Sequence, residues 1–192
     1  MQILFDTKAD PQTYENQTNK YPEAPARCPL CNHPVKMKKH GYYKRYIILI
    51  DFEGNIYVRR YICEKCRRTV SMLPAFCVQK YQYGAVVIIL ALLIAMTNSK
   101  RYVEAKWALR PQTLSRRHII LYQRRVEQNR KQIQLGLNLM SPRFIDLQQI
   151  TGDTDWTRSF LRAVEELNPP QFNFRYHSLL GKSFMSLNNR VA

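Results

Sequence analysis

The pattern of hydrophobic and polar positions predicts a β-hairpin in the first half of the chain. Residues 42–50 (YYKRYIILI) and 56–62 (IYVRRYI) are rich in β-branched and aromatic residues, and they enclose Asp51-Phe-Glu-Gly-Asn55. A short segment containing Gly-Asn between two such runs is typical of a hairpin turn. Residues 1–26 show no such pattern and contain three prolines, so we expect an extended leader there.

The second half of the chain has helical periodicity. Residues 81–97 include the apolar run Ala85–Met96, which is twelve residues long. A helix needs about twenty apolar residues to cross a bilayer, so this run predicts a buried core helix. A second helix is expected over 100–109, capped by Asn98 or Ser99 and ended by Pro111.

A third helix is expected to begin at a cap, Thr113 or Ser115, and to run to about Gln134. Its apolar face consists of Ile119, Tyr122, Val126 and Ile133. Its opposite face is basic and polar, with Arg117, Arg124, Gln128 and Lys131 at the centre and Arg116 and Arg125 at the margins. A short turn followed by a basic amphipathic helix favours a helix-turn-helix, although a plain helical bundle has the same pattern. Ile120 and Leu121 fall on the basic side or its edge, where they can contact thymine methyl groups or pack on another part of the protein.

The C-terminal segment, 141–192, is predicted to contain one helix over 153–167. Trp156, Phe160, Val164 and Leu167 share one face of it, and Asn168-Pro169-Pro170 ends it. The remaining residues have no clear period. The acidic residues of this helix lie close together in the sequence and lack the distant carboxylate partners of a catalytic metal site. We therefore expect a core or docking helix and no catalytic residues.

These elements predict an α+β protein. We divide it into a leader (1–26), a cysteine-containing ribbon (27–76), a helix-turn-helix domain (80–135) and a C-terminal helix and tail (141–192). A protein partner or a homodimer through the C-terminal segment is a possibility that the sequence leaves open.

Charge separates this chain from an ordinary globular protein. It has 30 Lys and Arg against 14 Asp and Glu, a net charge of +16. Residues 27–68 and residues 100–131 each contribute +8, and the rest of the chain sums to zero. Such a balance favours a polyanionic partner, with nucleic acid before an anionic membrane surface. Each basic block coincides with one of the expected structural patterns.

Four of the five cysteines form two Cys-x-x-Cys pairs, Cys28 with Cys31 and Cys63 with Cys66. Two such turns supply the four thiolates of a tetrahedral, closed zinc site. The 31 residues between the pairs exceed the common spacing, but a hairpin accounts for the excess. We therefore predict one structural Zn²⁺ in a zinc ribbon, and we expect Cys77 to be a small buried residue. No secretory signal is recognised, and a reducing, cytoplasmic compartment fits cysteines that bind metal.

The predicted hairpin also carries basic residues between its tyrosines. Basic groups hold phosphates, whereas aromatic faces stack on bases or sugars. A thin sheet covered by tyrosines, with solvated arginines, is the structural alternative. The candidate phosphate contacts on the hairpin are Lys44, Arg45, Arg59 and Arg60, and those of the third helix and its margins include Arg130 and Lys131.

The combined motifs resemble the N-terminal modules of bacterial insertion-sequence transposases and a related family of short transposase-like proteins. The similarity lies in Cys28-Pro-Leu-Cys31, His40-Gly41-Tyr42, Arg59-Arg-Tyr-Ile-Cys63, Cys66-Arg-Arg-Thr69 and Leu73-Pro-Ala-Phe76. It covers residues 27–130 and implies a mobile-element-related protein that binds double-stranded DNA at the nucleoid. In full transposases a carboxylate-bearing catalytic domain follows, and we expect none here.

The sequence thus favours a non-catalytic, sequence-specific DNA-binding protein that acts as an accessory factor or regulator. An RNA-binding zinc-ribbon protein is the alternative, because basic zinc ribbons also bind RNA. A truncated or partner-dependent transposase is the third possibility.

Overall fold

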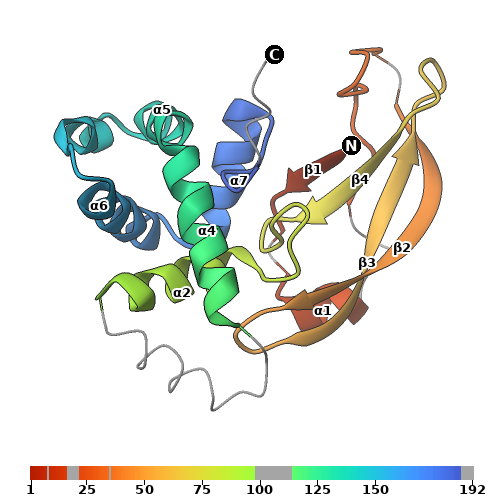
Figure 1. Cartoon of the computed structure of the whole chain (residues 1–192). Coiled ribbons are helices and arrows are strands. Elements are labelled where there is room, and N and C mark those ends of the chain that lie inside the picture. Colours follow the sequence, from red (N-terminus) through yellow and green to blue (C-terminus); the bar gives the residue numbers. More distant parts are fainter. Residues whose placement is uncertain (8, 17–21, 35, 98–113, 187–192) are drawn as a thin grey trace. The chain divides into compact units, whose positions relative to one another are not determined.

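The computed structural model describes residues 1–7, 9–16, 22–34, 36–97 and 114–186, and it divides the chain into two compact units. The first unit is 1–84 and the second is 85–192. The first contains a four-stranded sheet and the second is helical, so the α+β class expected from the sequence is confirmed (Figure 1). The division between the two units falls between Gly84 and Ala85. From residue 85 onward, the ranges 80–135 and 141–192, which the sequence analysis treats as separate, lie in the same second unit.

The first unit is built on a sheet with strand order β1-β4-β3-β2. Strands β2 and β3 are antiparallel, as are β3 and β4, whereas β1 runs parallel to β4. Its elements are β1 (Gln2–Phe5), α1 (Pro11–Asn16), β2 (Lys38–Ile48), β3 (Glu53–Ile62) and β4 (Thr69–Pro74).

The predicted hairpin is confirmed, but its turn lies earlier than expected. The register pairs Ile48 with Glu53 and Ile47 with Gly54, so Gly54 belongs to β3 and residues 49–52 form the turn. The amide of Leu49 donates to the carbonyl of Phe52 at 2.7 Å. The Phe52 ring lies over Gly54, 3.2 Å from the position that a Cβ atom would take. Gly54 therefore serves to accommodate a ring rather than to form the turn.

The leader is structured, contrary to the extended segment that we predicted. Its first residues form β1, which pairs with β4 from Gln2 to Phe5. Asp10 caps α1 by accepting the amide of Thr13 at 2.9 Å, and Pro11 occupies the first helical position, where proline is favoured. Tyr14 is fully buried, and its hydroxyl donates to the carbonyl of Tyr57 at 3.1 Å. Burial of this one aromatic side chain ties the leader to the sheet.

Residues 75–84 pack along β2, so the next helix begins later in the sequence than predicted. The amide of Ile48 donates to the Gln82 carbonyl, and the Gly84 amide donates to the Ile48 carbonyl, at 2.9 and 3.0 Å. A Cβ atom at Gly84 would lie 2.8 Å from the Phe76 carbonyl oxygen and 2.1 Å from the Leu49 side chain, so only glycine fits this approach. The helix predicted over 81–97 consequently begins at Ala85.

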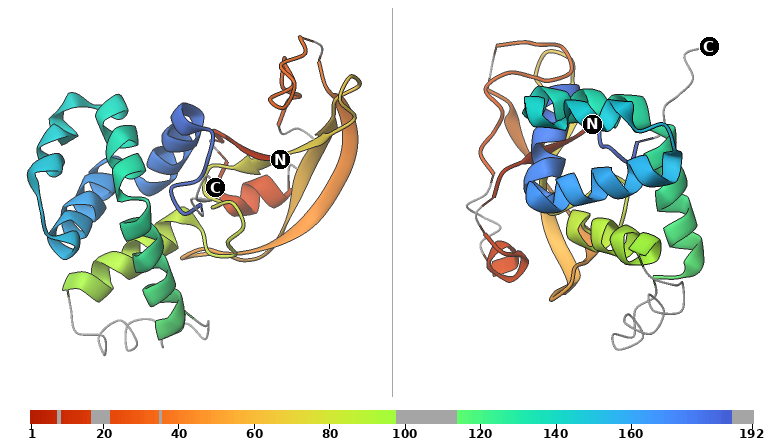
Figure 2. Two further views of the ribbon diagram at one scale, coloured as in Figure 1. Left: turned by 45° about the horizontal axis from the view of Figure 1, so that its top comes forward. Right: turned by 90° about the vertical axis from the view of Figure 1, so that its left-hand side faces the viewer.

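The second unit consists of helices that can be followed in Figure 2 from α2 to α7. Trp156 and Phe160 are buried and stack with ring centroids 5.4 Å apart, and Phe172 and Phe184 meet edge to face at 5.3 Å. Trp156, Phe160 and Val164 are buried on one face, as the periodicity predicts. The helices are α2 (Ala85–Thr97), α4 (Arg116–Gln128), α5 (Arg130–Met140), the 3-10 helix η1 (Pro142–Gln149), α6 (Asp153–Glu166) and α7 (Pro169–Leu180).

Helix α2 confirms the core helix expected from the apolar run. Val87, Ile88, Ala91 and Leu92 are buried within the second unit. In the described part of the chain, each helix is too short or too polar to span a bilayer. The second helix of the predicted helix-turn-helix, 100–109, lies outside the described residues, as does the alternative cap Thr113.

The single third helix predicted to reach Gln134 is instead two helices. Helix α4 ends at Gln128, Asn129 separates it from α5, and α5 continues to Met140. The buried side-chain amide of Asn129 donates to the carbonyls of Phe184 and Ser186, at 2.8 and 2.7 Å. Asn129 thus ends one helix, begins the next and holds the C-terminal segment.

Helix α7 is absent from the sequence prediction. Asn168 has a positive φ of 66°, and Pro169 and Pro170 occupy the first positions of α7. In the sequence, the two prolines predict the end of the helix expected over 153–167. They also start the next, because proline lacks only an amide that a first helical turn leaves unbonded.

Candidate metal centre and basic surfaces

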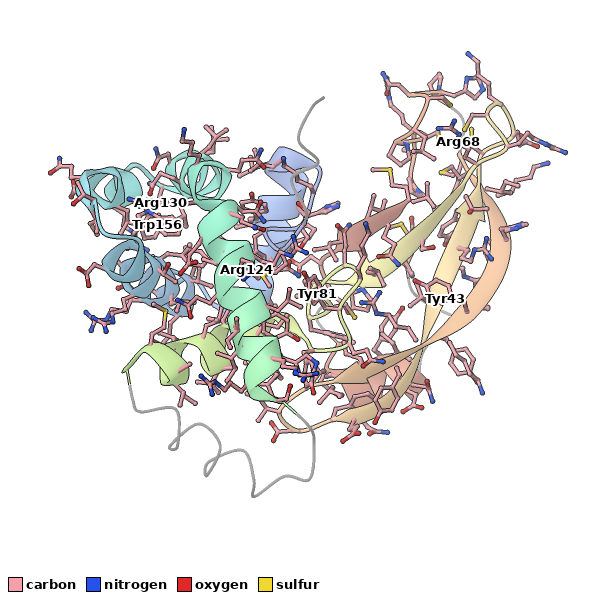
Figure 3. The ribbon with its side chains drawn as sticks, in the orientation of Figure 1. Tyr43, Arg68, Tyr81, Arg124, Arg130 and Trp156 are labelled. Carbon is pink, nitrogen blue, oxygen red and sulfur yellow. The ribbon has the colours of Figure 1, made fainter. Side chains whose placement is uncertain are left out.

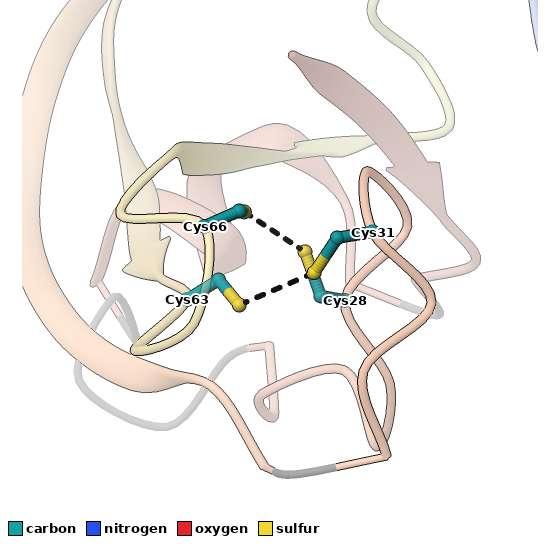
Figure 4. A group of neighbouring side chains, drawn as sticks. All are labelled: Cys28, Cys31, Cys63 and Cys66. Atoms are coloured by element: carbon teal, nitrogen blue, oxygen red, sulfur yellow. Dashed lines mark hydrogen bonds between the residues drawn. The ribbon is translucent and has the colours of Figure 1, made fainter.

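The four paired cysteines meet in one cluster, shown in Figure 4. All four Sγ atoms lie within 4.8 Å of one another. The distance from Cys28 to Cys66 is 3.8 Å, and that from Cys31 to Cys63 is 3.7 Å, measured between Sγ atoms. Four sulfur ligands about 2.3 Å from a tetrahedral Zn²⁺ are about 3.8 Å apart. The cluster therefore has both the donor set and the spacing to hold a metal ion.

The two Cys-x-x-Cys turns have the same backbone geometry. In the first, the Cys28 amide donates to the His33 carbonyl at 3.0 Å, and the Asn32 amide donates to the Cys28 carbonyl at 2.8 Å. The second repeats both bonds at equivalent positions, from Cys63 to Arg68 at 3.0 Å and from Arg67 to Cys63 at 2.9 Å. We call these turns the first knuckle (28–33) and the second knuckle (63–68).

Each knuckle contains a left-handed residue directly after its second cysteine. Asn32 has a φ of 54° and Arg67 a φ of 56°. This reversal of the chain turns each pair of thiols toward the other knuckle. Asparagine adopts such a φ at little cost, whereas arginine does so less readily.

Backbone amides prepare the first knuckle for a metal. Burial opposes ionisation of Cys28, but hydrogen bonds from the amides of Leu30 and Cys31 and from the thiols of Cys31 and Cys63 together outweigh it and lower the pKa of that thiol to about 7. At Cys31 the amide of His33 favours the thiolate, but burial and the neighbouring thiols outweigh it and raise the pKa to about 11. The Cys28 thiolate thus forms more readily than that of a free cysteine, and a bound metal ion would favour the thiolate at each of its ligands.

A small hydrophobic cluster surrounds the cysteines. Met37, Tyr61, Val70 and Met72 are buried with Cys28 and Cys63. The Tyr61 hydroxyl donates to the carbonyl of Pro22, which ties the end of the leader to the cluster. Cys77 is buried elsewhere in the sheet unit, and burial raises its pKa to about 12, as expected of a structural residue.

Most of the cations predicted on the hairpin are held by internal contacts. The Arg45 guanidinium donates to the carbonyls of Val78 and Tyr81, at 2.7 and 2.6 Å; Tyr81 is labelled in Figure 3. Arg59 is 8% exposed, and its guanidinium carbon lies 3.7 Å from the centre of the Tyr42 ring.

The other two hairpin cations differ in exposure. Arg60 is half-buried, and its guanidinium contacts the Thr69 hydroxyl at 3.3 Å. Lys44 is exposed beside the Tyr57 ring, 5.6 Å from its centre. Arg45 and Arg59 therefore stabilise the sheet unit, and Lys44 is the hairpin cation best exposed to a phosphate.

Helix α4 separates its buried and exposed residues as the sequence predicts. Tyr122 and Val126 are buried, Ile119 is half-buried, and Ile133 is buried on α5. Ser115 is the N-cap, and its amide donates to the His118 ring at 3.2 Å. We define the α4 outer face as the exposed residues of this helix, namely Arg116, Arg117, Ile120, Leu121, Arg124 and Gln128.

The structure divides the remaining predicted cations of the second unit. Lys131 is exposed on α5, whereas Arg125 is half-buried and contacts Gln128 at 3.3 Å. The Arg130 guanidinium donates to the carbonyls of Ile150 and Thr151 and lies 5.2 Å from the centre of the Trp156 ring (Figure 3). These contacts fix Arg130 in the helical unit and leave it little capacity for a phosphate.

A second group of basic residues, next to the cysteines, is absent from the contacts predicted from the sequence. Seven of the nine exposed Lys and Arg in the described part of residues 1–84 lie within the second knuckle or close to the first in sequence. The signal was their adjacency to the metal ligands; the alternation of basic and aromatic residues drew attention to the hairpin instead. We call this set the knuckle cations: Arg27, Lys36, Lys38, Lys39, Lys65, Arg67 and Arg68.

Comparison with protein families gives one match. Residues 28–116 match a domain of unknown function (DUF6431), a range that begins at the first metal-site cysteine and ends at the first residue of α4. The match therefore includes both knuckles and the hairpin. Neither the curated proteins nor the solved structures give a match to this chain.

Proposed function

We propose that the cysteine cluster binds one structural Zn²⁺. Four thiolates at tetrahedral spacing suit Zn²⁺, and with four protein ligands the coordination sphere is closed to substrate. Cys28, Cys31, Cys63 and Cys66 would hold the ion, and the ion would stabilise the fold of the knuckles. Elemental analysis of protein purified with Zn²⁺ present should give one zinc per chain. Protein without metal, or with a metal lost on mutation of Cys77, would contradict this assignment.

We further propose that the chain is a non-catalytic, sequence-specific DNA-binding protein. The observation that supports this most is the α4 outer face, which combines exposed arginines with two exposed apolar side chains. Ile120 and Leu121 are 44% and 39% exposed. A purely solvated helix face would have no use for two large apolar residues between arginines.

The spacing along α4 suits insertion into a DNA groove. Arg117 and Arg124 are seven residues apart, about 10 Å along the helix axis and nearly two turns. Both side chains consequently point the same way, into a major groove that is about 12 Å wide. Arginine recognises guanine by donating to O6 and N7 together, and apolar side chains contact the thymine methyl group.

The chain's motifs add a biological context to this proposal. The resemblance to transposase-type zinc ribbons favours a role as an accessory factor or regulator of a mobile element. Lys131 on α5 and Arg116 on α4 would contact phosphates beside the groove.

Selection of bound sequences from a random duplex pool would define a cognate site and test the proposal. Arg117→Ala should then reduce the preference for that site by about 1–3 kcal/mol, with a small effect on random DNA. Lys131→Ala should weaken cognate and random duplexes equally, and Arg162→Ala, an exposed residue outside this face, should change neither. Equal losses for Arg117→Ala and Lys131→Ala would make α4 a phosphate clamp. Tighter binding of structured RNA than of any selected duplex would overturn the DNA assignment.

A further inference from the structure

We propose that the knuckle cations form a second DNA-contacting surface, which binds the phosphate backbone of duplex DNA. This inference rests on the proposed DNA-binding function and adds to it a site in the first unit. It moves the phosphate contacts of that unit from the middle of the hairpin to the end that holds the cysteines.

The fold gathers these cations from three separate stretches of sequence. The four Sγ atoms bring the two knuckles together; Arg27 directly precedes the first knuckle, and Lys65, Arg67 and Arg68 belong to the second. Strand β2 adds Lys39, which pairs with Tyr61 of β3; Tyr61 belongs to the hydrophobic cluster that surrounds the cysteines. Arg68 is labelled at this end of the sheet unit in Figure 3.

Few negative charges oppose this surface. Residues 27–50 contain no Asp or Glu. Glu64, in the second knuckle, pairs with Lys38 at 2.5 Å, and Glu23 is exposed near the end of the leader. In the described part of the chain, Lys39, Lys65, Arg67 and Arg68 have no ion-pair partner. A protein surface that keeps this many unpaired cations attracts a polyanion.

Charge balance at the metal site does not account for the number of cations. A Zn²⁺ ion with four thiolates would carry a net charge of −2, and the Leu30 amide, which donates to the Cys28 sulfur at 3.4 Å, offsets part of it. Seven exposed cations exceed that charge. They also extend outward, whereas Arg45 and Arg59 of the same sheet are held by internal contacts.

The test compares variants that remove three positive charges in different places. The knuckle variant is Lys65→Gln/Arg67→Asn/Arg68→Gln; asparagine suits position 67 because Asn32 occupies the equivalent left-handed position. The control is Lys80→Gln/Arg143→Gln/Arg162→Gln, which alters exposed cations outside both proposed surfaces. Binding to the selected duplex is measured over a range of salt concentrations, together with zinc content.

The knuckle variant should retain its zinc, and its slope of log K against log[salt] should be less negative by about 2–3. Its affinity should fall on the order of 100-fold near 0.1 M salt. The control should keep the wild-type slope. If the first variant loses zinc, Arg27→Gln/Lys36→Gln/Lys39→Gln, which alters knuckle cations outside the second knuckle, should produce the same change in slope.

The inference is overturned if a zinc-loaded knuckle variant keeps the wild-type slope. It is also overturned if the slope changes only with structured RNA. Failure of the proposed function has a different signature, in which the wild-type protein and the control also fail to bind duplex DNA.

Discussion

The two units of this protein have buried cores of different composition. The helical unit encloses buried aromatic residues, with Trp156, Phe160, Phe172, Tyr176 and Phe184 in contact through ring pairs. The knuckle end of the sheet unit has a small buried cluster, in which two of the six members, Cys28 and Cys63, are metal-site cysteines. Small domains with little apolar surface to bury commonly require a metal or disulfides. We therefore expect the metal to stabilise the first unit and to have little effect on the second.

The largest expected effect comes from removing the metal. Structural zinc sites contribute on the order of 10–16 kcal/mol to folding in small zinc-binding peptides. Cys63→Ser, or chelation of the metal, should therefore unfold the knuckles. Trp156 is buried in the second unit, so its fluorescence should change little. Zinc content and circular dichroism measure the first effect.

Cys77→Ser is the matched control, because Cys77 is buried but belongs to no metal-site cluster in the described residues. It should leave the zinc content unchanged. Loss of the tryptophan signal together with the metal would show that the two units unfold as one, and it would remove the contrast between them.

A smaller effect is expected from a cavity in the helical unit. Phe160 is fully buried between Trp156 and Phe172, with ring centroids 5.4 and 5.7 Å away. Phe160→Ala should destabilise the second unit by about 3–5 kcal/mol, as measured by urea unfolding with tryptophan fluorescence. Zinc content should not change.

Leu139→Ala provides the control for that substitution, because Leu139 is 57% exposed on α5. It should cost less than about 0.5 kcal/mol. If Phe160→Ala also releases zinc, the aromatic core supports the metal site and the units are not independent.

Elements in both units were predicted well from the sequence where their signal is local. The cysteine pairs, the hairpin strands and the core helix α2 each have a strong local signal, either a spacing or a continuous pattern. The third helix was predicted with the correct buried face, since Tyr122, Val126 and Ile133 are buried on both sides of the break at Asn129. Local sequence patterns were therefore sufficient to predict an element whose structure depends mainly on its own residues.

Elements that depend on distant partners were missed. Strand β1 has four residues and pairs with β4, about seventy positions later, so no local pattern distinguishes it from a loop. The break at Asn129 depends on the carbonyls of Phe184 and Ser186. Arg130 was predicted to contact a phosphate because the sequence does not show that its guanidinium donates to the carbonyls of Ile150 and Thr151. Tertiary contacts, not propensities, determine these features.

A moderate effect is expected where α5 approaches α7. A Cβ atom at Gly136 would lie 2.7 Å from the Tyr176 ring, too close for unstrained packing. Glycine to alanine inside a helix normally stabilises it by up to about 1 kcal/mol, but here Gly136→Ala should destabilise the second unit by about 1–3 kcal/mol. Urea unfolding followed by tryptophan fluorescence measures the change.

A double-mutant cycle with Tyr176→Leu tests the cause of that destabilisation. The smaller side chain removes the ring, so the double variant should be more stable than the sum of the two single effects implies. Additive effects would show that Gly136 matters for a reason other than the approach of the Tyr176 ring.

The smallest expected effect distinguishes the two knuckles. Arg67 and Asn32 occupy equivalent left-handed positions, but a side chain other than asparagine or glycine is disfavoured there. Arg67→Gly should therefore stabilise the zinc-loaded protein by up to about 1 kcal/mol, whereas Asn32→Gly should change stability by a few tenths at most. Competition with a chelator measures both.

Arg67→Gly should at the same time make the slope of log K against log[salt] for DNA binding less negative by about 1, because it removes one proposed phosphate contact. A variant that gains stability and loses DNA affinity would show that Arg67 is retained for binding at a cost to the fold; one that loses stability would show that its side chain supports the knuckle.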